Sequence, residues 1–138
     1  MTLPADTDFD SWLQEMPRAL ETFLRAVPDA VAAQLDYSAA SLEVLEKWLL
    51  ASFATLATFQ ASDARSLYDG GARYVGEVFR RHLGGSWDLD RRKRSPFYGL
   101  PILFETRSLG TACPHTLLST SFDRNTGTFM RSVLTDHA

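Results

Sequence analysis

Residues 64–87 constrain the fold of this 138-residue chain more than any other segment. Their apolar side chains recur at three- and four-residue steps, a spacing that predicts an amphipathic helix over 64–83. Gly84 and Gly85 can supply the left-handed backbone that ends a helix. The alternation from Ser86 to Asp90 has the period of a strand, so we expect one long helix that packs on a core and leads directly into a sheet.

Four charged residues recur every four positions along this helix: Asp69, Arg73, Glu77 and Arg81. They form one polar stripe, and their opposite charges predict salt bridges worth about 0.2 to 0.5 kcal/mol each on an exposed helix. We expect the stripe to face solvent, either as solvated salt bridges alone or as a recognition surface. Catalysis by Glu77 would need burial to raise its pKa, and the neighbouring arginines favour the opposite shift.

Three glycines, Gly70, Gly71 and Gly76, lie within the predicted helix. Each costs about 1 kcal/mol relative to alanine in a helix interior, so their presence needs a structural reason. We favour the close approach of another backbone. A ligand pressed against the helix and a helix that begins only after Gly71 are the alternatives. No strand precedes these glycines at the spacing of a phosphate-binding loop.

The chain before this helix predicts two further helices. Residues 9–27 have helical apolar spacing that is interrupted at Pro17, because proline lacks an N–H and collides with the preceding turn. A second helix over 42–56 can begin with a hydroxyl cap from Ser38 or Ser41. Both helices present one apolar face and should pack on the same core.

The chain after it predicts a small sheet and two short helices. Residues 97–105 form a second strand, which Pro101 should place at an edge or give a bulge. Short helices should follow from Pro114 and over 129–134. The whole chain, residues 1–138, is therefore predicted to be one α+β domain, with N-terminal helices and the central amphipathic helix packed on a small antiparallel sheet and short C-terminal helices.

Membrane insertion and secretion are disfavoured by the sequence. No apolar run approaches the roughly 20 residues that cross a bilayer. The first ten residues hold acids where a signal peptide has a basic start and an apolar centre. The one cysteine, Cys113, cannot form an internal disulfide. We expect a cytoplasmic protein.

The net charge of −3 conceals an asymmetry. Up to Asp63 the chain has ten acidic and three basic residues, and from Ala64 onward it has seven acidic and eleven basic residues. The two halves can complement each other in the fold, or their charges can simply be solvated. Alternatively, the second half carries a surface for an acidic partner.

The most basic run lies in the loop between the two predicted strands and consists of Arg91, Arg92, Lys93 and Arg94. Arginine and lysine at a hairpin tip can follow phosphates, and nearby aromatic rings can stack on bases. A solvated loop explains the same run. A nucleic-acid-associated protein that uses Arg91–Arg94 is therefore an alternative function.

Cys113 and His115 offer the second alternative, a small enzyme. A thiol at a helix start has a lowered pKa and can act as a nucleophile, provided that His115, His82 or Glu77 converges on it in a cleft. The histidines and the cysteine lack the paired spacing of a structural metal site. We assign no catalytic residue, no metal and no cofactor.

Residues 71–87, with Leu35-Asp36-Tyr37-Ser38 upstream, resemble small bacterial proteins of uncharacterised families. Those proteins also place a Gly-Glu helix before Leu-Gly-Gly and a tryptophan-bearing strand. The resemblance implies an α+β fold and no established activity. Some similar proteins are immunity proteins of bacterial toxin systems, which act by binding. No functional residue is carried over from them.

The sequence thus favours a non-enzymatic protein-interaction module, with an immunity-like role as one form of it. The partner is expected to be another protein or a second copy of the chain. The expected binding residues are those of the helical stripe and of the basic loop: Asp69, Arg73, Glu77, Arg81, Arg91, Arg92, Lys93 and Arg94.

Overall fold

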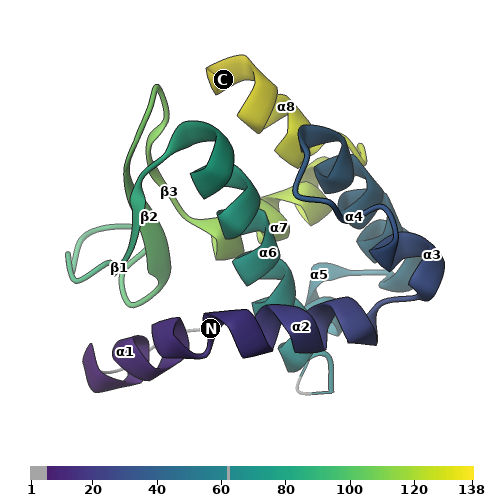
Figure 1. The fold of residues 1–138 in the computed structure, drawn as a ribbon, viewed down its shortest axis with the longest axis horizontal. Coiled ribbons are helices and arrows are strands. Elements are labelled where there is room, and N and C mark those ends of the chain that lie inside the picture. Colours follow the sequence, from purple (N-terminus) through teal and green to yellow (C-terminus); the bar gives the residue numbers. More distant parts are fainter. Residues whose placement is uncertain (1–5, 62) are drawn as a thin grey trace.

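Figure 1 shows the computed structural model of the chain, which describes residues 6–61 and 63–138. Residues 1–5, the start of the acidic N-terminal segment, lie outside these ranges. The described residues form α1 (Asp6–Gln14), α2 (Met16–Ala26), α3 (Asp29–Ala32), α4 (Ala39–Ser52), α5 (Leu56–Gln60), α6 (Arg65–Leu83), β1 (Ser86–Leu89), β2 (Pro101–Thr106), β3 (Gly110–Ala112), α7 (Pro114–Arg124) and α8 (Phe129–His137). The strands form one antiparallel sheet, so the predicted α+β fold is confirmed.

Helix α6 passes through the middle of the molecule (Figure 1). The sheet lies on one side of it, α4 and α8 lie on the other, and α2 crosses its N-terminal end. The predicted range 64–83 agrees with the observed helix to within one residue. The apolar face of α6 contributes buried side chains to one hydrophobic cluster that also includes residues from both ends of the chain. The helix is therefore the centre of the core.

The apolar pattern over 9–27 is divided at Glu15 into α1 and α2, as Pro17 predicted. Pro17 lies in the first turn of α2, where the missing N–H has no intrahelical acceptor to lose. At the start of α4, the hydroxyl of Ser38 accepts the backbone N–H of Ser41 at 3.2 Å. The helix ends at Ser52 and α5 is separate, so the second predicted helix is shorter than expected.

The sheet has the order β1-β2-β3, so Pro101 does not mark an edge. It is the first residue of the central strand and pairs with Leu89 at the end of β1, a position where a missing donor is tolerated. The pairing of β2 with β3 is irregular between Leu103 and Thr106, whereas Pro101, where a bulge was expected, pairs in register with Leu89. Strand β3 was not predicted, because three residues are too few to show a period.

Gly84 and Gly85 turn the chain from α6 into the sheet. Their φ angles of 74° and 91° lie in the left-handed region that favours glycine. The turn directs β1 back toward α1, so that Trp87 of β1 meets Trp12 of α1 edge to face, with ring centres 5.1 Å apart. The Gly-Gly pair thus sets where the tryptophan of the strand lies.

A buried carboxylate from α4 completes the start of α8. No side chain at the N-terminus of α8 caps the helix. Instead Glu46, which is fully buried, accepts the backbone N–H groups of Phe129 and Met130 at 3.0 and 2.9 Å. Burial raises the pKa of Glu46, although these hydrogen bonds act in the opposite direction. The contact fixes α8 to α4, although Glu46 and Phe129 are 83 residues apart in the sequence.

Candidate functional site

The polar stripe of α6 does not face solvent, contrary to the sequence-based expectation. Arg73 is only 3% exposed and Glu77 only 7%, and of the four stripe residues Arg81 alone is exposed. Trp12 of α1 and Trp87 of β1 pack over the stripe and bind its carboxylates. The stripe therefore lies in the interface between α6 and its neighbours.

Asp69 is the centre of a first polar cluster. Its Oδ1 accepts the indole N–H of Trp12 at 2.9 Å, and its Oδ2 accepts Nε–H of Arg73 at 2.8 Å. Nε2 of His115 on α7 lies 3.4 Å from Oδ1. The guanidinium of Arg73 also donates to the carbonyl oxygen of Trp12 at 2.7 Å and lies 4.1 Å from its ring centre. The cluster joins α1, α6 and α7.

The surroundings of this cluster lower the pKa of Asp69 and also the pKa of His115. Burial works to raise the pKa of Asp69, but hydrogen bonds from His115, Arg73 and Trp12 outweigh it and lower that pKa to about 2. His115 is 1% exposed, and burial lowers the pKa of its imidazole. An ionised Asp69 therefore faces a neutral His115, whose proton lies on Nε2 because that nitrogen faces the carboxylate.

The Asp69–His115 pair resembles the carboxylate and imidazole of a catalytic site, in which the carboxylate orients the imidazole. In such sites the second imidazole nitrogen takes a proton from a nucleophile. Here Nδ1 of His115 has no hydrogen-bond partner among the described residues, and its ring stacks on Tyr68 with centres 5.6 Å apart. The pair therefore stabilises the packing of α7 against α6 and has no hydroxyl or thiol to activate.

Glu77 is the centre of a second cluster. Its Oε2 accepts Nε–H of Arg80 at 2.8 Å and the indole N–H of Trp87 at 2.9 Å, and its Oε1 accepts Nη2–H of Arg80 at 3.0 Å. Burial favours a higher pKa, but the bonds from Arg80 and Trp87 outweigh it and the pKa of Glu77 is lowered. An ionised carboxylate with three donors is a poor general acid or base.

The glycines of α6 make room for aromatic side chains, not for another backbone as we expected. A Cβ at Gly76 would lie 2.1 Å from Cη2 of Trp87, and one at Gly70 would lie 2.8 Å from Cβ of Phe23. Gly71 is less constrained, because a Cβ there would lie 3.4 Å from Cδ1 of Leu118.

Gly76-Glu77, Leu83-Gly84-Gly85 and Trp87 consequently belong to one packing arrangement. Gly76 leaves space for the indole ring of Trp87, Glu77 accepts its N–H, and the Gly84-Gly85 turn returns it to α6. Gly76, Glu77, the Gly84-Gly85 turn and Trp87 thus have a structural explanation in the packing of β1 against α6.

A shallow cavity of about 360 Å³ opens beside the second cluster and is lined by Leu13, Met16, Glu77, Arg80, Gly85, Ser86 and Trp87. Leu13 is 36% exposed at its border. Phe104, which is 43% exposed, pairs with Ser86 across the sheet, so its side chain lies on the face of the sheet opposite to Trp87. We call the part of this cavity between Leu13 and Trp87 the Leu13–Trp87 face. Among the described residues, the one other exposed large hydrophobic residue is Tyr98, in the hairpin loop.

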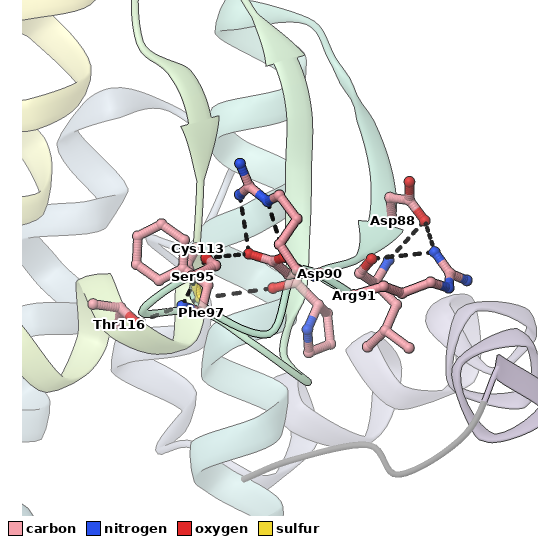
Figure 2. Close-up of polar contacts among 10 residues, drawn as sticks. Asp88, Asp90, Arg91, Ser95, Phe97, Cys113 and Thr116 are labelled. Atoms are coloured by element: carbon pink, nitrogen blue, oxygen red, sulfur yellow. Dashed lines mark hydrogen bonds and ion pairs between the residues drawn. The ribbon is translucent and has the colours of Figure 1, made fainter.

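The basic loop is partly neutralised within the chain. Nε and Nη2 of Arg92 donate to the carboxylate of Asp90 at 3.1 and 3.0 Å, and the hydroxyl of Ser95 donates to the same carboxylate. These bonds lower the pKa of Asp90 to about 2, with the hydrogen bond from Arg92 as the largest cause. The carboxylate of Asp90 therefore holds the loop through its hydrogen bonds with Arg92 and Ser95. Figure 2 shows Asp90 beside Ser95.

Arg91 covers the end of β1. Its Nη1 donates to Asp88 at 3.0 Å and to the carbonyl oxygen of Leu89 at 3.2 Å, while Asp88 accepts the backbone N–H of Leu89 at 2.8 Å. Figure 2 shows this arrangement. Lys93 and Arg94 are exposed and have no ion pair with another described residue. Two of the four predicted binding residues are thus used to build the hairpin.

The structure does not bring Cys113, His115 and His82 together as an enzyme would require. The thiol of Cys113 is buried beside the carbonyl oxygen of Pro101 and the hydroxyl of Thr116, as Figure 2 shows. Burial raises its pKa, the opposite of what activates a nucleophile. His82 is bound to the carbonyl oxygen of Tyr37.

Comparison with known proteins gives no relative, since no family model, curated protein or solved structure matches the chain. Within residues 6–61 and 63–138, no three His, Cys, Asp or Glu side chains are grouped so that they could hold a metal ion. No helix in the described part of the chain is both long and apolar enough to cross a membrane.

Sequence reasoning missed the residues that complete these clusters. Trp12 was assigned to an apolar helix face and Trp87 to a strand, and neither was recognised as a donor to a carboxylate. His115 was considered only as a partner of Cys113. The Gly-Glu and Trp pattern was the available signal for Trp87, whereas the distance of 57 residues between Trp12 and Asp69 left no local signal.

Proposed function

We propose that this chain is a non-enzymatic protein-interaction module that binds its partner through the Leu13–Trp87 face. One observation carries the proposal: the exposed hydrophobic side chain of Leu13 borders a cavity that also has Trp87 and Arg80 in its wall. Tryptophan and arginine are enriched among the residues that dominate binding energy at protein interfaces. A partner side chain in this cavity would contact both.

The buried charges support binding over catalysis. Asp69, Arg73 and Glu77 are satisfied by neighbours inside the fold. Each of these contacts joins secondary-structure elements or fixes a side chain in place. Polar groups used in this way stabilise a rigid scaffold, and a rigid scaffold that presents an apolar face binds a partner with little loss of conformational entropy.

The Leu13–Trp87 face replaces the two surfaces that the sequence favoured. The stripe of α6 is largely buried, and Arg91 and Arg92 are bound to carboxylates, so that Lys93 and Arg94 are the basic side chains left for phosphates. The nucleic-acid alternative requires retention on heparin that decreases steeply with salt and disappears when Lys93 and Arg94 are neutralised. An unchanged elution profile would remove it.

The proposal places the protein in the cytoplasm, where the thiol of Cys113 stays reduced. An immunity-like role, with a toxin as the partner, is the form that the sequence resemblance favours.

Photo-crosslinking in living cells tests the proposal. The substitution Leu13→p-benzoylphenylalanine places a crosslinker on the face, and the matched control, Tyr98→p-benzoylphenylalanine, places it in the hairpin loop. We expect a protein adduct of defined mass from position 13 and none from position 98. Equal labelling from both positions, or no adduct from position 13, would contradict the proposal.

A further inference from the structure

We infer that a second cavity, formed where α4, α5 and α7 meet, binds a small organic ammonium ion. Its volume is about 370 Å³, which lies within the range of small-molecule sites in proteins. Its wall consists of the last turn of α4, the segment 53–56 and the C-terminal half of α7. None of the residues in this wall lines the cavity of the Leu13–Trp87 face, so the two sites are separate.

Two aromatic rings in the wall are held in place by a third ring. Phe59 is fully buried, and its ring centre lies 5.0 Å from that of Phe53 and 5.3 Å from that of Phe122. Phe53 and Phe122 are only partly buried, and both line the cavity. Aromatic rings attract cations, and proteins bind quaternary ammonium ions between such rings. The wall therefore has the side chains that an organic cation requires.

The charge of the wall has the sign that attracts a cation. Among the described residues that line the cavity, Asp123 alone has a charged side chain. It is exposed and forms no ion pair with another described residue. The guanidinium of the adjacent Arg124 lies 5.7 Å from the ring centre of Phe129 on α8 and is not part of the wall. The carboxylate of Asp123 is therefore available to a cationic ligand.

Two helices bring their C-terminal ends to the same cavity. Helix α4 ends at Ser52 and α7 ends at Arg124, and residues of both last turns line the cavity. The last carbonyl groups of a helix lack N–H partners and carry a partial negative charge that favours cations. The N-terminal end of α5 also reaches the wall, but α5 has only five residues and the hydroxyl of Thr55 accepts the N–H of Thr58 at 3.2 Å. The helix ends therefore add to the charge of Asp123.

An organic cation fits this wall better than a metal ion does. Mg²⁺ and Ca²⁺ are bound by about six or more oxygen ligands, whereas the wall offers one carboxylate. An ammonium ion with alkyl groups can contact the rings of Phe53 and Phe122 and the carboxylate of Asp123 at the same time. Choline has this chemistry and is the probe for the site.

Titration of the isotopically labelled chain with choline chloride, followed in amide NMR spectra, tests the inference. We expect saturable shifts that are largest for the amides of residues 50–56 and 119–125. The uncharged carbon isostere of choline, in which a quaternary carbon replaces the nitrogen, should bind at least about tenfold more weakly. The absence of saturable shifts in these segments, or equal affinities for choline and the isostere, would overturn the inference.

Two substitutions separate the contributions of charge and of the rings. Asp123→Asn should weaken choline binding about three- to fivefold, whereas Asp136→Asn removes the same charge from an exposed position of α8 and should leave binding unchanged. Phe122→Leu keeps an apolar side chain but removes a ring, so it should weaken the binding of choline more than that of the isostere.

Circular dichroism shows whether each variant is folded. Because Asp123 and Asp136 are both exposed, their comparison holds even if Phe122→Leu does not fold. Equal effects of Asp123→Asn and Asp136→Asn on choline binding would overturn the inference, as would a folded Phe122→Leu variant that binds choline as wild type does. The crosslinking experiment at position 13 concerns another cavity, so its outcome is independent of these results.

Discussion

The indole ring of Trp87 lies where the side chain of any residue other than glycine at position 76 would have to be, with only 2.1 Å between Cη2 and the site of a Cβ atom. The same ring donates its N–H to Glu77, the residue that follows Gly76. Two adjacent residues of α6 therefore determine where the side chain of Trp87 lies. Gly76 leaves space for the ring, and the carboxylate of Glu77 accepts its N–H.

Gly76→Ala should destabilise the fold by about 2 to 4 kcal/mol, because overpacking and the loss of the Glu77–Trp87 hydrogen bond outweigh the higher helix propensity of alanine. Urea denaturation followed by tryptophan fluorescence measures the change. Gly71→Ala is the matched control and should change the free energy of unfolding by less than about 1 kcal/mol, since Leu118 can move. Equal effects of the two substitutions would contradict this account of Gly76.

Glu46→Ala should destabilise the fold by about 2 to 4 kcal/mol, because it leaves the buried N–H groups of Phe129 and Met130 without an acceptor. Hydrogen exchange of the first turn of α8 should accelerate more than that of α6. Glu43→Ala is the control, since Glu43 makes partly exposed ion pairs with Lys47 and Arg131 that contribute less than about 1 kcal/mol. If Glu46→Ala were as mild as the control, the cap would have no energetic role.

Asp69 should contribute to acid denaturation. Its pKa is about 2 in the fold and 3.8 in the unfolded reference, so its contribution of about 2 kcal/mol is present above pH 3.8 and is lost as the pH falls through about 2. The difference in unfolding free energy between wild type and Asp69→Asn should therefore decrease over that range. Asp123→Asn, on an exposed residue, should show no comparable trend, and a difference that is independent of pH would refute the assignment.

Asp90→Asn should loosen the hairpin loop, because an amide cannot accept the bonds of Arg92 and Ser95 as a carboxylate does. Limited digestion with trypsin should cleave the variant after the basic residues of the loop faster than it cleaves wild type. Asp88→Asn alters a half-exposed partner of Arg91 and should have the smaller effect. Identical digestion rates in all three proteins would show that the loop is ordered by other contacts.

The periodicity of the sequence was sufficient for the longer helices and for the extent of α6, because those elements depend on local spacing, but it did not predict the short helices α3 and α5. Periodicity did not predict that the charged stripe of α6 is largely buried. Period alone cannot tell a polar face that meets water from one that meets the donors of distant residues, and here the donors are Trp12 and Trp87. The central place of Pro101 was missed for a similar reason, since strand order depends on a partner, β3, of only three residues.

The binding residues were predicted from charge. Arg73, Arg91 and Arg92 are bound to carboxylates of the same chain, whereas Arg81, Lys93 and Arg94 are exposed. Leu13 carries no local signal of function, because an exposed leucine is recognised only once the fold shows that no other element covers it.

The cap that Glu46 gives to α8 couples the docking of that helix to the burial of a carboxylate. The acceptor and the donor lie 83 residues apart, so during synthesis the carboxylate is made long before the helix that it will meet. It stays hydrated until α8 arrives, and its transfer into the interior then coincides with the docking of that helix. Undocking of α8 would therefore return the carboxylate of Glu46 to water.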